Sequence, residues 1–223
     1  MIYNPIISEK SSVGYHTLII PGSRWKVRTL TYKISKYPTT KRLSNSEVDK
    51  EIQKALQVWS DVTDLSFEQR SNGRVHIDVR FEDGEHGDGD PFDGMGGTLA
   101  HAYFPVYGGD AHFDNSEFWT IGSYKGTNLL QTAAHEFGHS LGLSHSDQYK
   151  ALMAPFYRGY ESKVRLDEDD VTAVQALYGR RDTKKAAPAQ ESFKPGEVIF
   201  LQRKQVLEIY QWKEGPRLSK TDQ

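Results

Sequence analysis

The feature that most constrains the fold is the segment HEFGHSLGLSH, which runs from His135 to His145. Residues four apart lie on one face of a helix, so His135 and His139 can direct their rings at one ion. His145 cannot reach that ion along a straight helix, because about 15 Å of rise would separate it from His135. Gly142 has no Cβ and can adopt a left-handed conformation that ends the helix. The segment therefore predicts a helix that ends near Gly142 and a turn that brings three imidazoles together.

The composition of this cluster predicts its chemistry. Three neutral imidazoles leave one position of a tetrahedral zinc ion open, which is typical of a catalytic site. We expect water there, with Glu136 beside it, because the residue next to the first ligand is too close in sequence to bind the same ion easily. Its carboxylate can accept a proton from the attacking water and deliver it to the leaving amine. The pattern predicts metal-assisted amide hydrolysis; zinc binding without catalysis, and histidines with no metal, are the alternatives.

Composition narrows the kind of metal site and of partner. The chain has no cysteine, which excludes disulfides, thiolate zinc sites and a thiol nucleophile, so any metal must be held by nitrogen and oxygen. Residues 1–179 hold 18 Lys and Arg against 24 Asp and Glu, a net charge of −6, whereas residues 180–223 hold 10 against 6, a net charge of +4. An acidic body argues against nucleic-acid binding and would suit a protein that holds cations. No apolar run is long enough to span a membrane.

Apolar periodicity predicts a mixed order of strands and helices. Alternation with a period of two predicts strands at Thr29–Ile34, Val75–Phe81 and Thr98–Phe104. Helical spacing predicts a helix that begins at the Ser44 and Glu47 capping box and extends to about Val62, and two more at about Asn128–Leu143 and Asp167–Tyr178. The stretch after Phe81 is rich in glycine and aspartate and lacks regular periodicity, which indicates a segment organised by ions or by binding.

The zinc motif resembles that of the metzincins, and among them the matrix metalloproteinases. The motif continues to Ala151-Leu152-Met153, where Met153 matches the Met-turn that lies beneath the zinc in this family. The resemblance covers about Pro21 to Gly179 and is to invertebrate members, since the loop between His101 and His112 is shorter than in vertebrate relatives. It implies a metzincin or zincin-like α+β fold: a twisted, mostly parallel sheet with three helices, one of which carries HExxHxxGxxH.

The resemblance also implies two zinc ions and at least one calcium ion. The residues that match the structural zinc ligands of the family, a closed set of three nitrogens and one oxygen, are His86, Asp88, His101 and His112. The implied calcium ligands are the side chains of Asp93, Asp114 and Glu117 and the carbonyls of Gly94, Gly96 and Thr98. The alternatives are ordinary loop histidines and a solvated acidic loop.

Further calcium sites depart from the family pattern. His76 stands where the family has an aspartate, which leaves Asp110 and the carbonyls of Gly108 and Gly109 as candidates for a second calcium ion. At a third site the family has two aspartates where this chain has Thr40 and Asn115, so we expect that site to be weak or absent.

A substrate site is predicted beside the zinc. The strand at Thr98–Phe104 offers an edge to which an extended peptide could add by main-chain hydrogen bonds. The candidate substrate-binding residues are Leu99, Ala100, Gln131, Thr132, Pro155 and Tyr157. Gln131 and Thr132 stand where the family commonly has larger apolar residues, which favours a more polar and narrower specificity pocket.

The resemblance implies a zinc-dependent endopeptidase that cuts extracellular-matrix and other secreted proteins, collagen included. It also implies protein inhibitors of metalloproteinases as partners, a monomer and an extracellular location. The alternative is a catalytically silent, truncated zinc domain that binds peptides or inhibitors as a decoy.

The two ends of the chain lie outside the resemblance. Residues 1–20 show no period and no signal-peptide core, and we expect a disordered leader that does not belong to the family. For residues 181–223 we expect a hinge-like linker and a short tail, with no hemopexin domain. Within the tail, Glu197–Trp212 has a helical or strand-like apolar pattern that is too short for a core of its own, so we expect it to be poorly ordered or a remnant. A chain with the catalytic domain alone and an incomplete gene model both fit these ends.

Overall fold

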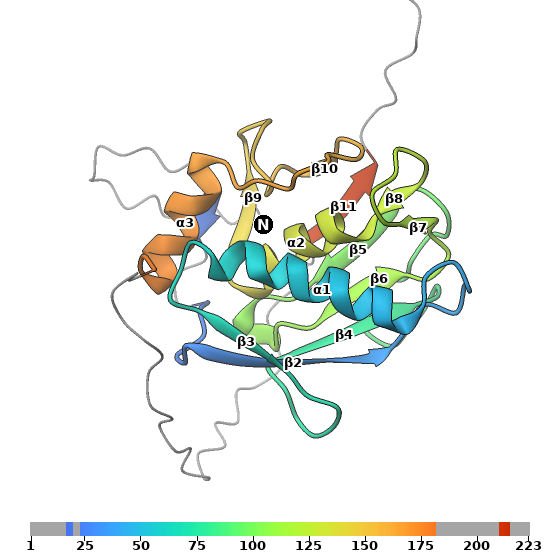
Figure 1. Cartoon of the computed structure of the whole chain (residues 1–223), viewed down its shortest axis with the longest axis horizontal. Coiled ribbons are helices and arrows are strands. Elements are labelled where there is room, and N and C mark those ends of the chain that lie inside the picture. The colour runs from blue at the N-terminus through green and yellow to red at the C-terminus, as the bar shows by residue number, and fades with distance from the viewer. Residues whose placement is uncertain (1–16, 20–22, 182–209, 215–223) are drawn as a thin grey trace, which may run out of the picture.

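The computed structural model describes residues 17–19, 23–181 and 210–214. In this part of the chain three α-helices lie around one mixed sheet of seven strands (Figure 1). The strand order is β10-β11-β5-β6-β4-β2-β3. The predicted fold class, a mostly parallel sheet with three helices, is confirmed.

Four strands form the parallel part of the sheet: β2 (Thr29–Lys36), β3 (Ser66–Gln69), β4 (Ile77–Glu82) and β6 (Ala111–Asp114). Next to them β5 (Thr98–Ala102) runs antiparallel to β6. The remaining two strands are β10 (Phe156–Tyr157) and β11 (Tyr210–Glu214). The three predicted strands are confirmed with shifted ends. The sequence did not predict β3 or β6, because strands of four residues are too short for alternation to be recognised.

The helices begin where side chains satisfy their free N–H groups. Helix α1 (Asn45–Ser60) starts with the predicted capping box, in which Ser44 and Glu47 exchange hydrogen bonds. Helix α2 (Leu129–Ser140) has Asn128 as its N-cap. Helix α3 (Glu168–Tyr178) starts with a second capping box, formed by Asp167 and Asp170. All three predicted helices are confirmed.

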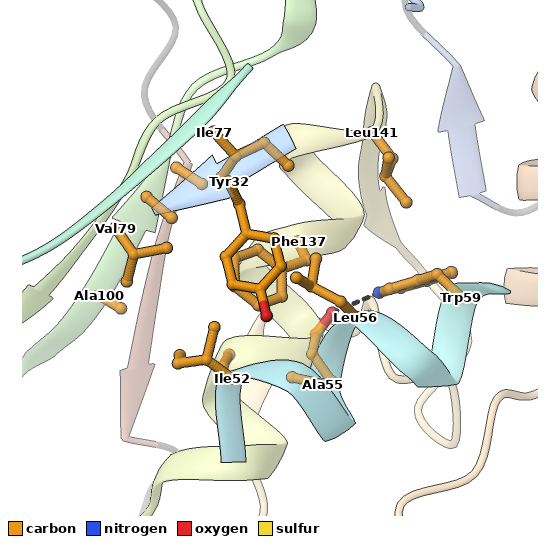
Figure 2. Packing of buried hydrophobic residues seen from close by; sticks show 14 of the residues in the cluster. Tyr32, Ile52, Ala55, Leu56, Trp59, Ile77, Val79, Ala100, Phe137 and Leu141 are labelled. Carbon is orange, nitrogen blue, oxygen red and sulfur yellow. Dashed lines mark hydrogen bonds between the residues drawn. The ribbon is translucent and has the colours of Figure 1, made fainter. Parts of the chain in front are cut away.

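The main core lies between the sheet and helices α1 and α2 (Figure 2). Phe137 of α2 and Ile52 of α1 are buried there with Ile77 and Val79 of β4. The indole N–H of Trp59, at the end of α1, donates to the carbonyl oxygen of Ala134 at 2.8 Å. This bond and the apolar contacts fix α2, the helix with the zinc motif, against the rest of the domain.

Shorter elements complete the described chain. They are β1 (Thr17–Ile19), the 3₁₀ helix η1 (Pro105–Tyr107), β7 (Trp119–Thr120), β8 (Thr127–Asn128) and β9 (Leu143–Ser146). Strand β1, in the segment expected as a leader, pairs antiparallel with β9.

Strand β11, in the segment expected as a tail, joins the main sheet, which the sequence did not predict. Residues 1–16 and 182–209, where the remaining expectations for the two ends fall, lie outside the described residues. Across the described helices, no segment has the length and apolar character needed to cross a membrane.

Candidate metal centre and active site

The zinc motif folds as the sequence predicts. His135 and His139 lie one turn apart on α2, which ends at Ser140. Gly142 has a φ of 101°, and a Cβ built on it would lie 2.1 Å from the carbonyl oxygen of Ser23. Glycine is therefore required by both the backbone angle and the space. The chain then enters β9 and returns with His145.

The three imidazoles come together at one point. The ligand nitrogens of His135, His139 and His145 all lie within 4.8 Å of one another. The two Nε2 atoms of His139 and His145 are 3.3 Å apart. Two nitrogens about 2.0–2.1 Å from a tetrahedral zinc ion would lie about 3.3–3.4 Å apart, so this pair fits one shared ion.

Backbone carbonyls orient the two helical histidines. The Nδ1 atom of His135 lies 2.7 Å from the oxygen of Leu152, and the Nδ1 atom of His139 lies 2.7 Å from the oxygen of Leu143. These bonds place the proton on Nδ1 and direct Nε2 to the cluster. Burial, together with the neighbouring imidazoles, lowers the pKa of both rings well below the ordinary value, and burial lowers the pKa of His145 to about 4. The rings are thus neutral, the form that binds metal.

Glu136 follows His135, the first histidine of this cluster, on α2. It is fully buried, and among the described residues no group donates a hydrogen bond to either of its carboxylate oxygens. Burial raises its pKa well above the ordinary range. A buried carboxyl without a protein partner requires an explanation, and a ligand in front of the three histidines supplies one. The three histidines therefore fit a zinc ion.

Met153 follows Leu152, whose carbonyl oxygen lies next to the His135 ring. Its side chain is buried against Gly138, and a Cβ at Gly138 would lie 2.2 Å from the methionine sulfur. Asp170 of α3 holds this turn, because its carboxylate accepts from the backbone N–H groups of Leu152 at 2.8 Å and Met153 at 3.1 Å. We did not predict this role for Asp170. The D-x-x-D pattern at the start of α3 is a sequence signal for its cap, but not for its contact with the turn.

The second predicted zinc set also comes together. Oδ2 of Asp88 lies 2.7 Å from His86, 3.0 Å from His101 and 2.9 Å from His112, measured to the ring nitrogen in each case. The nitrogen of His112 lies 3.2 Å from that of His86 and 3.2 Å from that of His101. Burial and the nearby Arg80 guanidinium lower the pKa of His112 to about 3, so this ring is neutral. Four ligands with this spacing describe a closed tetrahedral site.

The predicted calcium ligands lie around one loop but do not form so tight a group. The backbone N–H groups of Gly94 and Gly96 donate to Asp114 and Glu117, and that of Thr98 donates to Asp93 at 3.0 Å. Among the imidazole nitrogens and carboxylate oxygens of the described residues, only the two histidine clusters bring three or more ligand atoms within 4.8 Å of one another.

The further calcium candidates make protein contacts of their own. The Oδ1 atom of Asp110 accepts from the backbone N–H of Asp78 at 2.9 Å, and Gly108 and Gly109 form the adjoining turn. His76 accepts a hydrogen bond at Nδ1 from the backbone N–H of Thr31 at 3.0 Å. Asn115 donates to the carboxylate of Asp83.

The predicted substrate residues lie on β5, at the start of α2 and in the segment after Met153. Leu99 and Ala100 lie in β5, Tyr157 lies in β10, and Pro155 precedes it. Gln131 bridges α2 to that segment, because its amide donates to Gly159 at 3.0 Å and accepts from Glu161 at 3.0 Å. Thr132 donates to the Asn128 carbonyl, and Asn128 in turn donates its backbone N–H to the Tyr157 hydroxyl. The start of α2 is thus tied to one wall of the predicted pocket.

Comparison with known proteins adds independent support. The family profile of the matrixins, a peptidase family, matches residues 24–179. Human matrix metalloproteinase-20 is 52% identical over 168 residues, which cover 73% of this chain and 34% of that protein. The interstitial collagenase of Bos taurus is 48% identical over 73% of this chain and 34% of its own length. The hatching enzyme of Paracentrotus lividus is 53% identical over 63% of this chain and 24% of its own length.

The chain spans about a third of the length of the first of these relatives. The matched region contains both histidine clusters, the Met-turn and all three helices. This chain belongs to the matrixin family of zinc metalloendopeptidases.

Proposed function

We propose that residues 21–180 form the catalytic domain of a zinc-dependent endopeptidase in which Glu136 is the general base. The observation that carries this proposal is the buried carboxyl of Glu136, which accepts no hydrogen bond from the described residues and follows His135 of the histidine cluster on α2. An inert histidine cluster would not need such a group, because burial of an unsatisfied carboxyl is unfavourable.

The residues divide the chemistry between them. His135, His139 and His145 would hold the zinc ion, which supplies a Lewis acid that polarises a carbonyl and lowers the pKa of water. Glu136 accepts one proton from the attacking water while the water oxygen bonds to the carbonyl carbon of the substrate. The same carboxyl then donates that proton to the nitrogen of the departing amine as the C–N bond breaks.

We also propose the remaining metals. His86, Asp88, His101 and His112 would hold a second, structural zinc ion, which the mutual distances of their ligand atoms support. Asp93, Asp114 and Glu117 would bind calcium together with the carbonyls of Gly94, Gly96 and Thr98, and Asp110 with Gly108 and Gly109 forms a second calcium candidate.

The substrates would be extended polypeptides that add to the edge of β5, with Leu99, Ala100, Gln131, Thr132, Pro155 and Tyr157 around the reacting bond. Names such as interstitial collagenase favour extracellular-matrix and other secreted proteins, and thus an extracellular location. Protein inhibitors of metalloproteinases are the proposed partners, and the chain would act as a monomer.

The first experiment is hydrolysis of a quenched fluorescent peptide by the purified chain, with and without a zinc chelator. We expect cleavage that the chelator abolishes and added zinc restores. Glu136→Ala should retain its zinc by elemental analysis while the rate falls by several orders of magnitude. Zinc-loaded, folded protein that cuts nothing would instead favour the peptide- or inhibitor-binding decoy, and full activity in Glu136→Ala would exclude it as the base.

The zinc count tests the second cluster. Elemental analysis should give two zinc ions per folded chain, and His112→Ala should reduce that count to one. His145→Ala is the matched control, because it should remove the other ion. A count of one in the unmodified chain would contradict the structural site and leave the catalytic proposal intact.

A further inference from the structure

The chain places one of its own segments along the edge where a peptide substrate would add. Strand β11 pairs antiparallel with β5, with Tyr210 opposite Ala102, Gln211 opposite His101 and Trp212 opposite Ala100. On its other side β11 pairs parallel with β10, with Lys213 opposite Phe156. The segment therefore fills the space between these two strands.

In the proposed function, β5 and β10 flank the bound substrate and form the two walls of a peptide groove. Strand β5 contains Leu99 and Ala100, and β10 contains Tyr157, all named above as substrate-binding residues. Figure 1 shows the β11 arrow in this space, close to α2, and residues of β11 contact that helix. An added peptide would need the same main-chain groups of β5, so the groove cannot hold both.

The pairing changes in the middle of the segment. The register with β5 shifts between Trp212 and Lys213, and the pairing with β10 begins at Lys213. Lys213 pairs with both neighbouring strands, with Thr98 of β5 and with Phe156 of β10.

Charge supports this arrangement. Residues 180–223 carry a net charge of +4, whereas residues 1–179 carry −6. Opposite net charges draw a tethered segment towards the body of the protein. The segment belongs to the same chain as the groove, so its binding is intramolecular and needs no second molecule.

We propose that residues 210–214 are an intramolecular ligand of the peptide groove, which competes with substrates for β5 and β10. This proposal rests on the proposed function of the groove. A groove that is filled for about nine-tenths of the time would raise the apparent KM about tenfold, because only the open fraction binds substrate. The kcat would stay the same, since the tail is absent from the groove once substrate is bound.

Hydrogen exchange tests the occupancy without relying on catalysis. The experiment uses the full chain with Glu136→Ala, a substitution that prevents it from cutting its own tail. Adding Gln211→Pro and Trp212→Pro removes two N–H groups from β11 and should speed exchange of the β5 amides that face it by about tenfold. Two prolines at Lys220 and Thr221, beyond the end of β11, are the matched control. Equal β5 exchange in the two variants would overturn the proposal.

Kinetics test the competition with Glu136 restored. The Gln211→Pro and Trp212→Pro variant should show an apparent KM about tenfold lower than the control, at unchanged kcat. A synthetic peptide of residues 207–215 should inhibit this variant competitively. An unchanged KM would overturn the proposal, and so would a large fall in Tm, which would identify β11 as a structural strand. Absence of turnover in every variant would count against the proposed protease, while the exchange result would still decide the occupancy.

Discussion

Gly142 offers the most direct test of how the sequence builds the histidine cluster. Its φ of 101° belongs to the region that L-residues rarely adopt, and the carbonyl oxygen of Ser23 lies where a Cβ would go. Gly73 is a matched control, because it also has a positive φ, of 79°, but nothing lies within 4 Å of an added Cβ. Alanine at the two positions therefore separates backbone strain from the collision with Ser23.

The expected magnitudes follow from these two terms. Strain at positive φ costs about 1–2 kcal/mol, which Gly73→Ala should show alone. Gly142→Ala adds the overlap with a backbone oxygen that cannot rotate away, and overpacking of this kind costs about 1–3 kcal/mol. The free energy of unfolding should therefore fall by about 2–5 kcal/mol. Because the displaced turn leads directly to His145, the affinity for zinc should fall as well.

Urea unfolding of the two zinc-loaded variants measures the first effect, and competition with a chromophoric chelator measures the second. Gly73→Ala should bind zinc as the unmodified chain does. Equal stability losses at the two positions, or unchanged zinc affinity in Gly142→Ala, would show that the turn tolerates a side chain. The explanation given for the return of His145 would then be wrong.

Three other perturbations have defined outcomes. Asp170→Ala leaves the backbone N–H groups of Leu152 and Met153 without their acceptor, so the free energy of unfolding in urea should fall by about 2–4 kcal/mol. Asp170→Asn keeps one of the two oxygens and should lose about half as much. Burial lowers the pKa of His76, so its neutral form is favoured in the folded state; stability should fall as pH drops below about 6.5, by at most about 1.4 kcal/mol per pH unit. His76→Asn should weaken this pH dependence. If the free energy of unfolding of the two proteins changed equally between pH 7.5 and 5.5, the prediction would be contradicted. A calcium-selective chelator should lower Tm before it alters kcat, because the proposed ion would hold a loop; an unchanged Tm would remove the calcium assignment.

Much of the cluster of His135, His139 and His145 could be predicted because its information is local. The four-residue spacing of His135 and His139 fixes one face of a helix, and Gly142 fixes where that helix ends. Capping boxes at Ser44 and Asp167 likewise mark helix starts by side chains that lie next to the backbone groups they satisfy. Patterns of this kind depend little on the rest of the molecule.

The features that were missed depend on distant contacts. Strand β6 is short, and its place between β4 and β5 is set by pairing across the sheet. Asp170 supports the Met-turn from a helix that follows it in sequence, and nothing in the pattern of α3 indicates that contact. The position of β11 depends on an edge more than a hundred residues away in sequence, so no local rule predicts it.

His101 and His112 face each other across β5 and β6, and β5 continues directly into the edge offered to polypeptides. The second ion would therefore stabilise β5, the strand to which a substrate would pair, at a distance from the bond that is cut. Zinc deficiency would then lower the activity of this protein in two separate ways. It would empty the site where the peptide bond is cut, and it would make β5, the strand that aligns the substrate, less rigid.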